Sequence, residues 1–448
     1  MIQPILFNQL VNWSVQYLLK SKVKYNQEYD LVNIGDFLTR NKTAVSIEDH
    51  KYYKRVTIKV RNGGVFLRDT EIGKNIGTKN QFLIKKGQFL LSKIDARNGA
   101  FGVVPEEVNG AIITGNFWTF DVDYSKINPH FLALITTTPE FISFCENASN
   151  GTTNRHYLQE SSFLEQLIPL PPLEEQNSLV SSYKGKLALA IDQIRRAKEL
   201  EHSIENYLFE VLKITKARAN RRGKGLTIIK FHSLNLWGAD KLLRGGNNSL
   251  LFSNKYANKK ISEIADVNPR TDITKLKDSD QMSFIPMECV SDDFGEVIEL
   301  RAGIKQTSKG YTKFQEGDLI WARITPCMQN GKSAIVKNLK NGFGYGSTEF
   351  HVIRNSKNNI DLEYLYHILR LNIVLQDAVN HFTGSAGQQR VPKSYLENLM
   401  IPVPPLRIQK EVSKNLFEIK EEIKKLNTQA EKNKQEALVE FEKQIFEQ

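Results

Sequence analysis

The chain has 448 residues, 40% of them hydrophobic, which is too long for one compact core and predicts two or more domains. Lysine and arginine exceed aspartate and glutamate by 11, an excess that favours a polyanionic partner, usually nucleic acid, over an ordinary basic protein. The three cysteines lie far apart, so the sequence indicates neither a zinc site nor a disulfide framework. It shows no signal peptide and no apolar run long enough for a membrane span, so we expect a cytoplasmic protein.

The first half of the chain recurs in the second half. The offset between matching stretches rises from 224 to 233 residues, as small loop insertions would produce. So large a period predicts two diverged copies of one domain rather than a solenoid. The matching pairs are FNQLVNWSVQYLL (7–19) with FHSLNLWGADKLL (231–243), LVNIGDFL (31–38) with ISEIADVN (261–268), KKGQFLLSKI (85–94) with QEGDLIWARI (315–324), and INPHFLALI (127–135) with IDLEYLYHI (360–368).

Each copy begins with short strand-like runs, among them 56–60, 118–122 and 350–353. One amphipathic helix follows, with Asn128 as its N-cap in the first copy and Asp361 at the same place in the second. A glycine-containing loop comes next, at 150–157 and 383–390. Each copy is therefore expected to be a mixed α/β unit.

A proline motif closes each copy: LIPLPPLEEQ at 167–176 and MIPVPPLRIQ at 400–409. Proline has no N–H and holds the preceding residue extended, so these stretches cannot lie inside a helix. Proline is tolerated in a first helical turn, where Glu174 and Glu175 also suit the helix dipole. Arg407 takes the place of Glu174 in the second copy, and a basic residue there suits the helix dipole less well. Each motif thus predicts a stiff joint that starts a helix.

The two helices that follow carry apolar residues in steps of three and four, the pattern of a coiled-coil seam. A polar residue interrupts each seam, Glu201 in the first and Asn433 in the second, and either could set the register. The first seam comprises Val180, Tyr183, Leu187, Ala190, Ile194, Ala197, Ile204, Leu208 and Val211, and the second Val412, Leu416, Ile419, Ile423, Leu426, Ala430 and Ala437.

The simplest arrangement pairs these helices with each other, antiparallel, although each could instead pack on its own domain. The expected fold class is α/β, or α+β: two similar globular domains separated by an intramolecular antiparallel coiled coil with pseudo-two-fold symmetry. The predicted parts are domain one at 1–172, the central helix at 173–215, domain two at 216–405 and the C-terminal helix at 406–448. Residues 213–230 hold seven basic residues and no acid, and form either a solvated linker or additional phosphate contacts.

No catalytic motif survives inspection. QNGKS (329–333) ends like a phosphate-binding loop, but Pro326 stands where the first glycine should be. The strings NPH (128–130) and NPR (268–270) do not complete the Asn/Asp-Pro-Pro-Tyr/Phe tetrapeptide of adenine methyltransferases. No glycine-rich nucleotide site, GxSxG or HExxH is present. These absences favour a binding protein.

Two diverged α/β copies, each ending in [LM]IP[LV]PPLxxQ and a long heptad helix, resemble the specificity subunit of Type I restriction-modification enzymes over essentially the whole chain. The resemblance implies that each globular unit is a target recognition domain and that the helices form the spacer between them. It also implies double-stranded DNA as ligand, two modification subunits that carry the S-adenosylmethionine site and methylate adenine N6, and two restriction subunits that can join. No cofactor and no metal would belong to this chain, and the target would be bipartite and asymmetric.

The residues that would contact DNA are polar and basic groups in the glycine- and asparagine-rich loops. Arginine suits guanine, and asparagine and glutamine suit adenine, but contact with phosphate or a plain surface position is the more common role of such residues. They are Lys93, Arg97, Asn98, Asn154, Arg155 and His156 in the first copy, and Arg323, Gln329, Asn330, Lys332, Gln388, Gln389 and Arg390 in the second.

Two other functions stay open at this point. One is a self-sufficient methyltransferase or nuclease with a cryptic site, which would bind S-adenosylmethionine or modify DNA alone. The other is a coiled-coil scaffold that binds RNA and never reads DNA.

Overall fold

The computed structural model describes residues 25–60, 63–150, 157–214, 250–384 and 389–446. They divide into two compact units. The first unit runs to Gln193 and resumes at Gln429, and the second comprises Ile194–Thr428. Each unit therefore contains one globular part and a segment of each of the two long helices.

The globular part of the first unit has two main sheets, of order β2-β10-β7-β8 and β3-β6-β9-β4-β5, and two ribbons, β1-β13 and β11-β12. In the described part of this unit, three helices accompany them. Its elements are β1 (Leu31–Asn33), β2 (Leu38–Asn41), β3 (Ala44–Ser46), β4 (Tyr52–Lys59), β5 (Gly64–Ile72), β6 (Asn80–Leu83), β7 (Phe89–Ser92), β8 (Phe101–Val103), β9 (Ile112–Ile113), β10 (Phe117–Val122), α2 (Pro129–Ile135), α3 (Pro139–Asn147), β11 (Ser149–Asn150), β12 (Tyr157–Leu158), α4 (Glu160–Leu164) and β13 (Leu167–Pro169).

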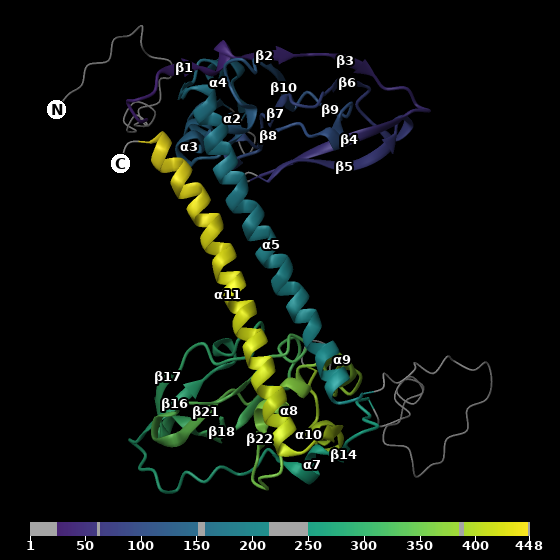
Figure 1. Cartoon of the computed structure of the whole chain (residues 1–448), viewed down its shortest axis with the longest axis vertical. Coiled ribbons are helices and arrows are strands. Elements are labelled where there is room, and N and C mark those ends of the chain that lie inside the picture. The colour runs from purple at the N-terminus through teal and green to yellow at the C-terminus, as the bar shows by residue number, and fades with distance from the viewer. Residues whose placement is uncertain (1–24, 61–62, 151–156, 215–249, 385–388, 447–448) are drawn as a thin grey trace, which may run out of the picture. The chain divides into compact units, whose positions relative to one another are not determined.

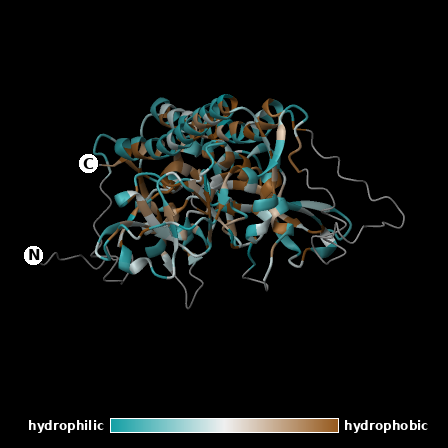
Figure 2. Cartoon of the chain, turned by 90° about the horizontal axis from the view of Figure 1, so that it is seen from below, coloured by the Kyte–Doolittle hydropathy of each residue, from teal (hydrophilic) through white to brown (hydrophobic). Residues whose placement is uncertain are grey.

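A group of buried phenylalanines joins these sheets and helices. The ring of Phe101 on β8 lies 6.3 Å from that of Phe89 on β7, 5.9 Å from Phe141 on α3 and 6.4 Å from Phe163 on α4. All four side chains are buried, and large aromatic rings contribute much of the apolar surface that a core removes from water. Figure 2 shows apolar residues gathered in the interior between sheets and helices.

The globular part of the second unit has sheets of order β15-β22-β19-β20 and β17-β16-β21-β18, and a ribbon β14-β23. Trp321 and Tyr364 are the largest side chains buried in its core. Its elements are β14 (Ala257–Lys260), α7 (Ile261–Ile264), β15 (Asp266–Val267), β16 (Gln281–Ile285), β17 (Arg301–Ile304), β18 (Thr312–Gln315), β19 (Leu319–Ala322), β20 (Ser333–Ile335), β21 (Phe343–Gly346), β22 (Phe350–Arg354), α8 (Leu362–Leu369), α9 (Asn372–Asn380), α10 (Lys393–Asn398) and β23 (Met400–Val403).

The two globular parts have the same topology. The sheet β2-β10-β7-β8 corresponds strand for strand to β15-β22-β19-β20, and β5-β4-β9-β6 corresponds to β17-β16-β21-β18. Each sheet of the second pair contains one parallel pair of neighbouring strands. These are β4 with β9 in the first unit and β16 with β21 in the second. Among the described residues, the first unit adds strand β3 beside β6 and the ribbon β11-β12. The predicted fold class, α+β with two similar globular parts and two long helices, is confirmed.

The sequence predicts a single helix after the strands of each copy. This prediction is wrong in both copies, because the structure has two helices there. α2 begins after Asn128, whose side chain accepts a hydrogen bond from the backbone of His130, with Pro129 in the first turn, as predicted. It ends at Ile135, and α3 begins after a second cap, Thr138. The following Pro139 cannot continue a helix but starts one readily. The second unit repeats the pair as α8 and α9.

The long helices are α5 (Leu173–Val211) and α11 (Leu406–Ile445). Their segments run antiparallel within each unit (Figure 1). In the first unit, Lys186 forms an ion pair with Glu440, and further along α5 Gln193 accepts a hydrogen bond from Asn433 at 2.9 Å. In the second unit, Tyr207 accepts a hydrogen bond from Asn415 at 2.7 Å.

The predicted seam residues of both helices are all buried or half-buried. Ala197 packs with Ile423 and Leu426 in one apolar cluster of the second unit. Glu201, in contrast, is exposed, and Leu200 joins that cluster. The interpretation of Glu201 as a polar seam residue is therefore wrong, whereas Asn433 does make a polar contact across the pair.

Gln176, the last residue of the first proline motif, ties α5 to the globular part of the first unit. Its side chain is buried and uses both ends of the amide. Nε2 donates to the carbonyl oxygens of Pro171 at 2.8 Å and Lys126 at 3.1 Å, and Oε1 accepts from the backbone N–H of Asn128 at 2.9 Å. The start of α2 is thereby held against the start of α5.

Gln409 does the same in the second unit. Nε2 donates to the carbonyl oxygen of Pro404 at 2.7 Å, and Oε1 accepts from the backbone N–H of Asp361 at 2.8 Å. Ser413, one turn later, donates to the Asp361 carboxylate at 2.7 Å. The repeated glutamine therefore joins the cap of α8 to α11 as Gln176 joins the cap of α2 to α5.

Two sequence observations lie outside the described residues: the pair of matching stretches at 7–19 and 231–243, and the basic run from 215 onward. Among the helices that are described, none is both long and apolar enough to cross a membrane.

Candidate nucleic-acid interface

The loop after β7 contains the first group of predicted DNA-contacting residues, and it lies against β12. The backbone carbonyl of Lys93 accepts a hydrogen bond from the N–H of Leu158 at 2.9 Å. The Lys93 ammonium group stands 5.3 Å from the ring centre of Tyr157. The structure thus places Lys93 next to Tyr157, the last residue of the glycine-containing loop at 150–157.

The other candidates of the first unit differ in exposure. Arg97 is half-buried within a short 3-10 turn, whereas Asn98 is exposed, and its amide donates to the Asp95 carboxylate at 3.4 Å. Asn154, Arg155 and His156 lie outside the described residues.

The second unit has the equivalent arrangement, made of different side chains. The carbonyl of Arg323, after β19, accepts a hydrogen bond from the N–H of Val391 at 2.8 Å, in the same way that Lys93 accepts from Leu158. The N–H of Thr325 donates to the carbonyl of Gln389 at 3.1 Å. Gln388 lies outside the described residues. The described residues that follow the two glycine-containing loops, Leu158 and Val391, thus occupy equivalent positions beside the candidate residues.

Arg390 and Arg323 share one carboxylate, that of Glu349. Arg390 makes charge-assisted hydrogen bonds to it at 2.7–3.0 Å, while Arg323 lies farther away, with Nε 3.7 Å from the carboxylate. The bonds from Arg390 are the largest cause that lowers the pKa of Glu349. Nε of Arg323 is buried without a hydrogen-bond partner. Two cations on one anion leave this edge of the second unit positive.

Gln329, Asn330 and Lys332 divide between surface and interior. Gln329 and Asn330 are exposed, and the Gln329 side chain accepts a hydrogen bond from the Thr325 hydroxyl. Lys332 instead donates inward, to the carbonyl oxygens of Val290 at 2.9 Å and Met287 at 3.3 Å. The Lys332 side chain therefore stabilises the segment that follows β16.

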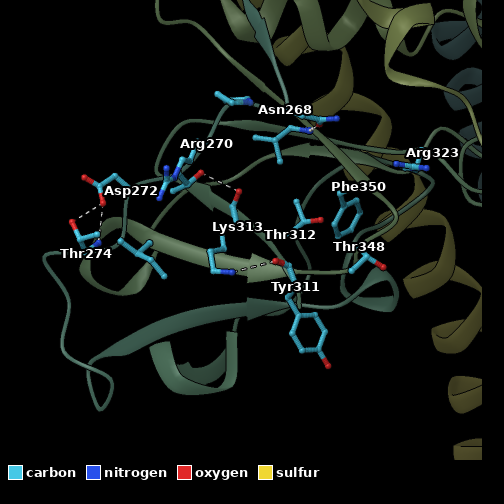
Figure 3. A pocket seen from close by; sticks show the side chains of 14 residues that line it. Asn268, Arg270, Asp272, Thr274, Tyr311, Thr312, Lys313, Arg323, Thr348 and Phe350 are labelled. Atoms are coloured by element: carbon cyan, nitrogen blue, oxygen red, sulfur yellow. Dashed lines mark hydrogen bonds between the residues drawn. The ribbon is translucent and has the colours of Figure 1, made fainter. Parts of the chain in front are cut away.

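A pocket of about 510 Å³ opens beside Arg323, and most of its lining was missed by the sequence interpretation. Figure 3 shows its side chains, which include Asn268, Arg270 and Lys313. In the sequence, the string NPR (268–270) is notable only as an incomplete methyltransferase motif. The signal that could have found it is the position of Arg270, a basic residue that follows Pro269 in the loop after β15 (Asp266–Val267).

Neighbouring His351 is structural. It is buried between the Asn268 amide, 2.9 Å from Nδ1, and the carbonyl oxygen of Val391, 2.9 Å from Nε2. Burial lowers the pKa of His351 to about 4, so the ring is neutral at ordinary pH. In the described part of the chain, no group of three or more histidine, cysteine, aspartate or glutamate side chains is placed to hold a metal ion.

Comparison with known proteins follows the same two-copy division. A family model, the Type I restriction modification DNA specificity domain, matches residues 26–226 and 254–434. The chain is similar to the EcoEI specificity subunit of the Type I restriction enzyme of Escherichia coli, with 42% identity over 148 residues, which covers 32% of this chain and 24% of that protein. It is also similar to the EcoAI specificity subunit of Escherichia coli, with 41% identity over 154 residues, 34% of this chain and 26% of that protein. The matches span about a quarter of the length of these relatives.

A solved structure is similar over nearly the whole chain. It was determined to explain complex assembly and conformational transition of the type I R-M system, and it covers 94% of this chain and 99% of its own, with a TM-score of 0.56 and 16% identity. At this identity the similarity concerns the fold alone.

Proposed function

The chain belongs to the family of Type I restriction modification DNA specificity domains, and from that premise we propose that it is the sequence-reading subunit of a Type I restriction-modification system. Each globular part would bind one half of a bipartite, asymmetric DNA target. The observation that carries the proposal is the pair of equivalent loop clusters with different side chains, Lys93 with Tyr157 in one unit and Arg323 with Arg390 in the other. One scaffold with two sets of contacts suits two different half-sites.

The proposed ligand accounts for the charge of the chain. An excess of 11 positive charges favours a polyanion, and phosphate contacts make such binding strong and dependent on salt. A DNA partner also agrees with a cytoplasmic location. The chain itself would be non-catalytic: two modification subunits would bring S-adenosylmethionine and methylate adenine, and two restriction subunits could join them.

Footprinting of the full chain with its modification subunit on double-stranded DNA tests the proposal. Two protected patches separated by an unprotected gap are expected, since each unit would cover one half-site. One continuous patch, or protection of RNA but not of DNA, would contradict it. A purified chain that methylates DNA alone would favour the self-sufficient enzyme instead.

The role of Arg390 can be tested in the same assay. Arg390→Ala should relax one half of the target if the side chain reads a base, and should weaken binding to all sequences equally if it contacts phosphate. Its bonds to Glu349 support the second outcome, because the guanidinium group is already paired on one side.

A further inference from the structure

The pocket beside Arg323 combines three cations from three separate segments of the second unit. Arg270 lies in the loop after β15, Lys313 on β18, and Arg323 directly after β19 (Figure 3). Among the described residues, neither Arg270 nor Lys313 forms an ion pair with a carboxylate within 4 Å. One acid, Asp272, also lines the pocket, and its carboxylate accepts hydrogen bonds from the backbone and hydroxyl of Thr274 at 2.9 and 2.7 Å. The pocket therefore has a positive balance.

The walls of the pocket are fixed by internal bonds. Arg354 forms a buried ion pair with Asp318 at 2.7 Å and donates from the same guanidinium group to the hydroxyl of Thr271 at 2.9 Å. That hydroxyl in turn donates to the backbone carbonyl of Lys313 at 3.1 Å. The loop that carries Arg270 and the strand that carries Lys313 are thus joined before any ligand arrives, which lowers the ordering cost of binding.

The one carboxamide side chain that lines the pocket among the described residues, Asn268, is already engaged. The carboxamide of Asn268 bonds to His351 through Nδ2 and accepts the N–H of Val352 at 2.9 Å through Oδ1, so it has no bidentate face left for adenine. Within the described residues, Lys313 donates to the carbonyl oxygen atoms of Ser308 and Tyr311, which are neutral and do not compensate its charge. The main feature that the pocket offers a ligand is therefore the positive charge of Arg270 and Lys313.

We infer that this pocket binds a backbone phosphate of the DNA target, with Arg270 and Lys313 as the main contacts and Arg323 at its edge. The inference rests on the proposed function and deepens it. The contact would position the second unit on the duplex without reading sequence, because phosphates are the same at every base pair.

The test uses the full chain with its modification subunit and a duplex that carries the mapped target. Affinity is measured as a function of salt for the unmodified protein, Arg270→Gln and Lys313→Gln. Each substitution should lower the magnitude of the slope of log K against log salt by about 0.9, the value for one lost phosphate contact. The loss of affinity should be the same on target and non-target DNA. Lys414→Gln is the matched control, because it removes an equally charged side chain from the exposed face of α11, which contributes nothing to the pocket.

A second measurement locates the phosphate. Single neutral methylphosphonate groups are placed in turn along the target, and the one that neutralises the bound phosphate should weaken the unmodified protein more than it weakens Lys313→Gln or Arg270→Gln, and should have no effect on the variant that carries both substitutions. If Arg270→Gln and Lys313→Gln match Lys414→Gln, or lose affinity for the target alone, the inference is wrong while the proposed function stands. If the unmodified complex does not distinguish target from non-target DNA, the proposed function itself fails. Thermal unfolding of each variant shows whether it is folded.

Discussion

The side-chain carbonyl of Gln176 accepts a hydrogen bond from the backbone N–H of Asn128 at 2.9 Å, 48 positions earlier in the chain. Asn128 is the cap of α2, and Gln176 lies in the first turn of α5, so one amide fixes the globular part of the first unit to its long helix. Gln409 and Asp361 repeat the contact in the second unit at 2.8 Å. The proline motif therefore acts as a joint in each unit. Its prolines start the long helix, and the side-chain amide of its last residue, glutamine, fixes that helix to the globular part.

Gln176→Ala should lower the free energy of unfolding of the first unit by about 2–4 kcal/mol, because it leaves the buried carbonyl of Pro171 and the part-buried N–H of Asn128 and carbonyl of Lys126 without their partner. Urea denaturation gives the size of the loss, and hydrogen exchange should show faster exchange at the Asn128 amide. Gln429→Ala is the matched control, since Gln429 is exposed on α11. Equal effects of the two substitutions would show that Gln176 is no joint.

Ala197→Glu should destabilise the chain by more than about 2 kcal/mol, because it places an unpaired carboxylate in the buried cluster with Ile423 and Leu426. The same substitution at Ala188, an exposed position on the same helix, should change stability by no more than about 0.5 kcal/mol. The change from alanine to glutamate has the same helix propensity cost at both sites. The difference in urea midpoint between the two variants therefore measures the packing of the seam at Ala197. A seam that does not pair would give the same midpoint for both variants.

Glu349→Gln should tighten binding to non-specific DNA and steepen its salt dependence. The carboxylate now neutralises part of the charge of Arg390 and Arg323, and its removal frees about one positive charge for phosphate. Fluorescence anisotropy at two salt concentrations measures the effect. Glu418→Gln on exposed α11 makes the same change of charge elsewhere and controls for it. Weaker binding by the Glu349 variant would mean that the ion pairs themselves build the DNA surface.

The stability of the second unit should increase as the pH rises above 7, because of the lowered pKa of Lys420. Burial, with Arg370 as a second cause, lowers the pKa of Lys420 to about 7, against an ordinary value near 10.5; Glu363 and Glu296 act in the opposite direction. Between these values the unfolded chain holds a proton that the folded chain lacks, so the free energy of unfolding rises with pH across this window.

Lys420→Met should remove this rise, which is measured as the difference between the two proteins in urea midpoint at pH 7 and pH 9. The side chain also donates to the hydroxyl of Tyr366 at 2.6 Å, so the variant should lose some stability at every pH. A constant difference between the two proteins from pH 7 to pH 9 would show that Lys420 keeps its ordinary pKa.

The organisation of the fold could be predicted from the sequence because it depends on local signals. The prolines at 171–172 and 404–405, the cap at Asn128 and the apolar steps along both helices each act over a few residues, and the repeat shows them twice. The apolar pattern predicts one helix across α2 and α3, although Thr138 and Pro139 between them form a helix start signal.

The candidate site was less predictable because it depends on contacts between distant segments. Nothing local distinguishes Lys332, which bonds inward to the carbonyl of Val290, from Lys313, which lines an open pocket. Glu201 fits the heptad count, yet Leu200 takes its place once the helix packs. The pairing of Arg390 with Glu349 joins residues 41 positions apart and follows only from the register of the strands.

Mapping of methylated adenines across a genome, in cells that express this chain with its modification subunit, tests the central claim most directly. Two different short half-sites separated by a gap of unspecified bases are expected, and exchange of one globular part for that of a relative should change one half only. A single uninterrupted motif, or the same methylation in cells that lack this chain, would contradict the claim that its two units read two halves of one target.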